Sequence, residues 1–124
     1  MNKQNILTDV LNIFFKHQIQ LKMYHFQTKS YGAHKASDSY LDGFLDKFDR
    51  FMEVAQGAFG RVETKNISAS IETVSDDSIN LILDKFIKEL RGFDTKFVGY
   101  SELLNIRDEL IADAEQLKYL LTFK

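Results

Sequence analysis

The segment GRVETKNISASIETV, residues 60–74, decides how the rest of the chain can be arranged. It is the one long stretch without helical spacing, and the alternation of Ile67, Ala69 and Ile71 predicts an extended chain. At ~3.3 Å per residue it can reach about 50 Å, whereas the helix predicted before it, residues 33–58, is about 39 Å long at ~1.5 Å per residue. The segment can therefore cross the whole length of a helix bundle.

On either side of this segment, four stretches show helical spacing of apolar residues: about 7–27, 33–58, 75–91 and 101–121. The chain has no Pro to interrupt them. Gly32 marks a short connection between the first two, which predicts an antiparallel pair. With one long crossover between the second and third helices, the sequence predicts an all-α four-helix bundle, residues 1–124 as a single domain, in which 75–91 runs parallel to 33–58.

Composition excludes several classes of function. A hydrophobic fraction of 44% with eleven Phe indicates a globular protein. No Cys is present, so a metal site would depend on His and carboxylate ligands, which suit iron, manganese or zinc. The net charge of −2 argues against a nucleic-acid partner. No apolar run reaches the roughly 18 residues of a membrane span, and no signal peptide is evident, so we expect an intracellular protein.

Five residues are candidate metal ligands: His25, His34, Asp38, Asp49 and Glu53. His34 and Asp38 are one helical turn apart, as are Asp49 and Glu53, and all four share one flank of the helix 33–58. The two pairs are about 22 Å apart along the helix, so one chain cannot bring them to one ion. Two antiparallel copies of the helix, related by a two-fold axis, can do so, and His25 can join from the neighbouring helix.

The same residues resemble the metal-binding pattern of the Dps family, the mini-ferritins. The stretch YHFQT around His25 is similar to that family's histidine signature, and His34, Asp38, Asp49 and Glu53 match its intervals on the second helix. The resemblance implies a ferritin-like bundle, a homodimer or larger homo-oligomer, and oxidation of Fe(II) by peroxide or oxygen at the dimer interface. His25 and His34 are nine residues apart where the family has twelve, and Phe26 replaces the usual Trp. The whole chain also resembles small viral and phage proteins.

A second interpretation keeps the bundle without the metal, as an interaction or structural protein. The shortened spacing of the two histidines favours it, and a buried histidine together with a solvated acidic flank would explain the same residues. A hydrolase or oxygenase acting within one chain would need a carboxylate cluster that the spacing does not provide. Of the remaining polar residues, His17 is predicted to be structural, and Asp113 is predicted either to form an ion pair with a neighbouring helix or to lie at a solvated edge.

Overall fold

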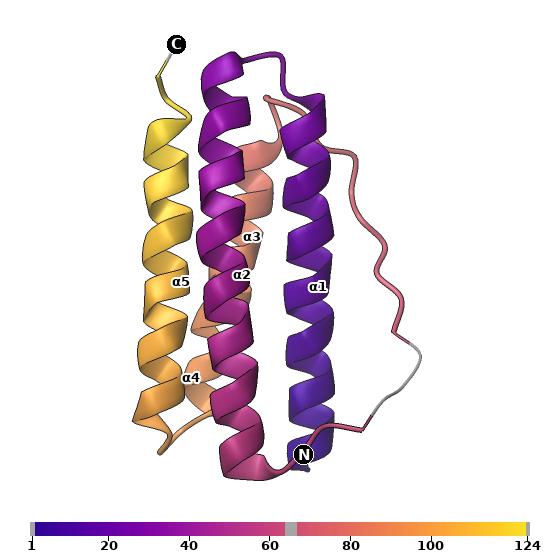
Figure 1. Cartoon of the computed structure of the whole chain (residues 1–124), viewed down its shortest axis with the longest axis vertical. Coiled ribbons are helices and arrows are strands. Elements are labelled where there is room, and N and C mark those ends of the chain that lie inside the picture. Colours follow the sequence, from indigo (N-terminus) through magenta and orange to yellow (C-terminus); the bar gives the residue numbers. More distant parts are fainter. Residues whose placement is uncertain (1, 64–66, 124) are drawn as a thin grey trace.

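The computed structural model describes residues 2–63 and 67–123. In these parts of the chain, four long helices pack side by side: α1 (Lys3–Gln27), α2 (Tyr31–Phe59), α3 (Ile79–Arg91) and α5 (Ser101–Leu120). A single-turn helix, α4 (Phe93–Lys96), joins α3 to α5. The predicted all-α bundle of four helices is confirmed (Figure 1). No helix in the described part of the chain is long and apolar enough to cross a membrane.

The ends of two helices differ from the predicted ones because polar side chains control them. The hydroxyl of Ser30 accepts a hydrogen bond from the backbone N of Ala33 at 3.2 Å, so α2 begins two residues before position 33. At the start of α3, the backbone N of Ser75 donates to the hydroxyl of Ser78 at 2.9 Å. Residues in between form a turn, and the helix begins only at Ile79.

The core is built around Phe14, which is fully buried in the middle of α1. Its ring lies 4.9–6.4 Å, centroid to centroid, from five other phenylalanines: Phe44, Phe48 and Phe51 of α2, Phe86 of α3 and Phe93 of α4. The three rings of α2 occur about once per turn, which is why the apolar spacing of 33–58 identified this face. Phe14 therefore packs α1 against α2, α3 and α4. Replacing such a buried ring by Ala typically costs 3–5 kcal/mol.

The described residues of the connection between α2 and α3, 60–63 and 67–78, lie beside α1 at the side of the bundle (Figure 1). The side-chain amide of Gln4 donates to the backbone O of Arg61 at 3.0 Å and accepts from the backbone N of Glu63 at 3.1 Å. Gln20 does the same further along, bonding the backbone O and N of Glu72 at 2.7 and 2.8 Å. The chain thereby returns to the end of the bundle where α2 begins, and α3 runs parallel to α2.

Candidate functional site

His25 and His34 lie face to face at the end of the bundle where α1 turns into α2. The Nδ1 atom of His25 is 2.9 Å from the backbone O of His34, and the Nδ1 atom of His34 is 2.9 Å from the backbone O of His25. Their rings stack with centroids 3.8 Å apart and 18° between the planes. The first is buried and the second half-buried. Two of the five predicted residues are therefore in direct contact.

The turn between the helices is held in place by Asp76, which lies just before α3. Its carboxylate accepts hydrogen bonds from the hydroxyl of Thr28 at 2.6 Å, the hydroxyl of Tyr24 at 2.9 Å and the backbone N of Lys29 at 3.1 Å. These bonds, that from Thr28 first, hold the pKa of Asp76 below its ordinary value of 3.8. From the sequence, Asp76 could be interpreted only as part of a helix-start signal. No spacing pattern links it to Thr28, which is 48 residues away in the chain.

Hydrogen bonding fixes the tautomer of both imidazoles. A backbone carbonyl can only accept, so each Nδ1 carries the hydrogen, and each neutral ring keeps its lone pair on Nε2. The buried hydroxyl of Ser37, 3.1 Å from Nδ1 of His25, donates to the same carbonyl of His34 at 3.1 Å and so supports this assignment. Imidazoles that bind metals commonly have such an anchored second nitrogen. Both rings are thus prepared to act as acceptors through Nε2.

The stacked arrangement limits what the two rings can do together. A metal ion lies close to the plane of each imidazole that binds it, at about 2 Å from the nitrogen. Two planes that differ by only 18° and lie one ring's thickness apart meet far beyond that distance. His25 and His34, as they are placed, cannot both coordinate one ion. His34 is the better placed of the two, since it shares a helix flank with Asp38 and is less buried than His25.

The three candidate carboxylates, those of Asp38, Asp49 and Glu53, are exposed along α2. Among residues 2–63 and 67–123, no group of three or more His, Cys, Asp or Glu side chains is placed to hold a metal ion. The structure therefore brings the two histidines together but leaves Asp49 and Glu53 distant from them. A full ligand set from these five residues requires a second chain.

An apolar surface between α1 and α2 borders two of these carboxylates, those of Asp49 and Glu53. Phe15 and Ile19 of α1 and Leu45 of α2 are 38%, 46% and 37% exposed. Between the two helices runs a groove to which Asp49 and Glu53 contribute, together with Leu11, Phe15, Leu45 and Phe48. We call this surface, with Ile19, the outer face. Acidic side chains beside exposed apolar side chains of two helices are a feature that the periodicity of either helix alone did not indicate.

The two residues predicted to be structural have partners inside the bundle. Asp113 of α5 forms an ion pair with Lys47 of α2, so of its two predicted roles the ion pair with a neighbouring helix is confirmed. The buried ring of His17 on α1 is hydrogen-bonded through Nε2 to the hydroxyl of Tyr40 on α2, at 2.6 Å. The identity of that partner could not be predicted from the sequence, because the two residues are 23 positions apart and lie on different helices.

Comparison with known proteins gives one match. Residues 25–121 match the model of DUF5856, a family of unknown function. No curated protein and no solved structure matches the chain. The matched region contains all five candidate ligands.

Proposed function

Because the chain belongs to DUF5856, a family of unknown function, its activity must be argued from its own residues, and we propose that it forms a homodimer that binds a divalent metal ion, iron first, between its two chains. The observation that carries this proposal is the outer face, where exposed apolar side chains lie beside Asp49 and Glu53, and no group of three possible ligands forms among the described residues of one chain. A second copy of the chain covers the apolar surface and supplies the missing ligands at the same time.

The positions along α2 fit a two-fold arrangement. The midpoint between His34 and Glu53 coincides with the midpoint between Asp38 and Asp49, between residues 43 and 44. When two copies of α2 pack antiparallel about that point, His34 faces Glu53 of the second copy, and Asp38 faces Asp49. Leu45 then lies close to the axis, where an exposed apolar residue gains most from being covered.

Charge beside the outer face is also complementary in the same arrangement. Lys22 and Lys35 lie near the turn between α1 and α2, whereas Asp49 and Glu53 lie in the second half of α2. Antiparallel packing brings the basic end of one copy to the acidic end of the other. Parallel packing would place like charges together, so the charge pattern favours the same orientation as the ligand positions.

In the proposed site, His34 supplies the nitrogen ligand, while His25 positions the His34 ring through the stacked contact and the hydrogen bond to its Nδ1. Asp38 of the same chain and Asp49 and Glu53 of the second supply oxygen ligands. One imidazole with several carboxylates suits iron or manganese, and also zinc. The resemblance to the Dps family adds oxidation of Fe(II) by peroxide or oxygen as the activity. The long connection between parallel α2 and α3 is the one used by ferritin-like bundles, which supports that resemblance.

A second candidate function is a homodimer without metal. The observation that favours it is the mutual contact of His25 and His34, which we call the histidine clasp. The mutual hydrogen bonds and stacking of His25 and His34 give both rings a structural role that needs no ion. In this version the protein keeps the outer face as its interface and acts as an interaction or structural module.

Light scattering combined with metal analysis tests both versions. We expect a dimer that binds about two ions of Fe(II), Mn(II) or Zn(II), one at each equivalent site. The double variant Asp49→Asn with Glu53→Gln should lose this binding and keep its helicity. Glu102→Gln with Glu109→Gln on α5 makes the same charge change away from the outer face and is the matched control. A dimer with no affinity for metal supports the second candidate, and a monomer excludes both.

A further inference from the structure

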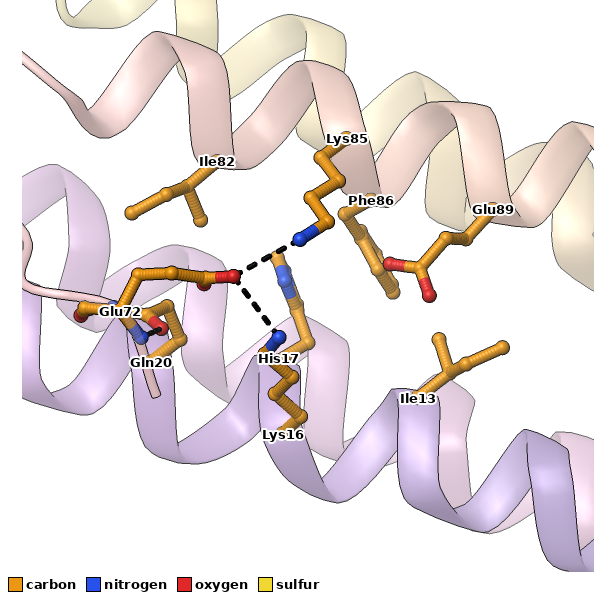
Figure 2. A pocket seen from close by; sticks show the side chains of 9 residues that line it. All are labelled: Ile13, Lys16, His17, Gln20, Glu72, Ile82, Lys85, Phe86 and Glu89. Carbon is orange, nitrogen blue, oxygen red and sulfur yellow. Dashed lines mark hydrogen bonds and ion pairs between the residues drawn. The ribbon is translucent and has the colours of Figure 1, made fainter. Parts of the chain in front are cut away.

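A small hollow lies on the opposite side of α1 from the outer face, between α1, α3 and the extended connection (Figure 2). It has about 20 Å³ of space for water, room for about one water molecule. The charged and polar side chains that line it are Lys16, His17, Gln20, Glu72, Lys85 and Glu89. Donors from two helices therefore converge on one point beneath the connection.

The base of the hollow is His17, whose side chain is nearly all buried, with 4% of the residue exposed. Its ring stacks on Phe86 with centroids 3.5 Å apart and 9° between the planes. The hydroxyl of buried Tyr40 has the Nε2 of His17 as its only hydrogen-bond partner among the described residues, so the phenol donates and Nε2 accepts. His17 must then carry its hydrogen on Nδ1. Burial lowers its pKa to about 3, so the ring is neutral near pH 7.

The Nδ1–H of His17 has no partner among the described residues, although every fully buried side-chain nitrogen and oxygen there does have one. That atom therefore reaches the hollow, which His17 lines. A donor that reaches an open space without a protein acceptor needs an acceptor in that space, either a water molecule or a bound anion.

Glu72 covers the hollow with a carboxylate. One oxygen, Oε1, accepts hydrogen bonds from Lys85 at 2.9 Å and from Lys16 at 3.0 Å (Figure 2). These two lysines, Lys85 first, lower the pKa of Glu72 to about 2. The backbone of Glu72 is held separately by the two hydrogen bonds to Gln20. The side chain can therefore swing out without releasing the connection.

We propose that this hollow is a binding site for a phosphate-class oxyanion, and that the Glu72 carboxylate is its built-in competitor. With Glu72 turned away, Lys16, Lys85 and the Nδ1–H of His17 remain as donors around an enlarged space. Glu89 is the one carboxylate left among the residues that line the hollow, and burial raises its pKa, which makes its negative charge easier to neutralise. A phosphate carries more charge than a carboxylate and has more acceptor oxygens, so it can engage all three donors where Glu72 engages two.

The competition sets the expected affinity. A tethered carboxylate acts at an effective concentration in the millimolar range, so phosphate should bind the natural chain only weakly. Removing the carboxylate should strengthen binding by about tenfold or more, because the lysines then lack a partner. The site is independent of the outer face, so its test does not depend on the proposed metal function.

The experiment compares Glu72→Ala with Glu63→Ala, a matched control in the same connection whose side chain is also exposed. Thermal unfolding is followed while inorganic phosphate is added at constant ionic strength, with chloride as the reference salt. We expect phosphate to stabilise Glu72→Ala at about a tenfold lower concentration than it stabilises the unchanged chain or the control. Glu72→Gln, which preserves the shape of the side chain, should shift in the same direction if Glu72→Ala folds poorly.

Two further measurements locate the ion. The Nδ1 and ring signals of His17 should move in NMR spectra as phosphate is added to Glu72→Ala, and adding Lys85→Ala should remove the response. Glycerol phosphate tests whether an esterified phosphate is also accepted. A Glu72→Ala response no stronger than that of Glu63→Ala, or one that persists unchanged without Lys85, overturns the proposal.

Discussion

His25 and His34 each donate the Nδ1 hydrogen to the other's backbone carbonyl, both at 2.9 Å, while their rings stack 3.8 Å apart. This clasp joins the last turn of α1 to the first turns of α2 and fixes which nitrogen of each ring can accept. The sequence alone gave both histidines the same predicted role as metal ligands. In the proposed site their roles differ: His34 would bind the ion, and His25 would hold the His34 ring in place.

The clasp should contribute to stability in the absence of metal. Replacing His25 by Ala removes a buried ring and leaves the His34 carbonyl with one fewer donor, so we expect the free energy of unfolding in chelator to fall by about 2–3 kcal/mol. The double variant with His34→Ala should show a coupling of about 0.5–3 kcal/mol. Urea denaturation measures both, with Lys29→Ala in the same turn as control. Additive losses would contradict the mutual contact.

Asp76 should make the turn between α1 and α2 sensitive to acid. Its pKa is lower in the folded chain than the ordinary 3.8, so its contribution is complete above that value and is lost as pH falls through the folded pKa. Asp76→Asn should cost about 1 kcal/mol at pH 7, since the carboxylate is exposed and partly screened. The difference from the unchanged chain should shrink as pH falls below 3.8. Asp77→Asn, next to it and also exposed, should have little effect at either pH.

His17 should affect stability in a higher pH range. The neutral ring has a folded pKa of about 3 against 6.5 in the unfolded chain, so the unfolded state binds the extra proton between these values. The free energy of unfolding should therefore fall as pH drops below 6.5, by up to about 1.4 kcal/mol per pH unit. Urea curves at pH 7, 6 and 5 measure the slope, and His17→Gln should flatten it. Equal slopes in both proteins would show that His17 titrates normally when folded.

The local spacing of apolar residues predicted most of the helices. It could not predict contacts between residues that are far apart in the sequence. The phenylalanines of α2 repeat about once per turn, so their spacing alone identifies the buried face of 33–58. The one-turn helix α4 was missed because the buried Phe93 at its start and the buried Phe97 just after its end are a single repeat, too short to stand out as a period.

The candidate site was predictable in part, for a related reason. Spacing placed Asp49 and Glu53 on one flank of a helix correctly, since that relation is local. It could not show that His25 and His34 stack, because their contact depends on the conformation of a three-residue turn that Asp76 holds from 48 residues away. The pairing of His17 with Tyr40 depends likewise on how α1 packs on α2. Contacts between helices are set by packing, which no single period encodes.

Leu45 is the residue whose change should most directly test the homodimer. It is 37% exposed on the outer face and lies beside the point about which both ligand pairs are symmetric. Leu45→Lys would place two ammonium groups near the two-fold axis, so we expect the dimer to dissociate, with light scattering giving half the mass. Circular dichroism should show unchanged helicity, because the side chain is already partly in water. Leu81→Lys on α3 introduces the same charge at a residue that is 72% exposed and outside the outer face, and it should leave the mass unchanged. If Leu45→Lys stays a dimer, the two chains meet elsewhere, and Asp49 and Glu53 lose the partner ligands that the metal site requires.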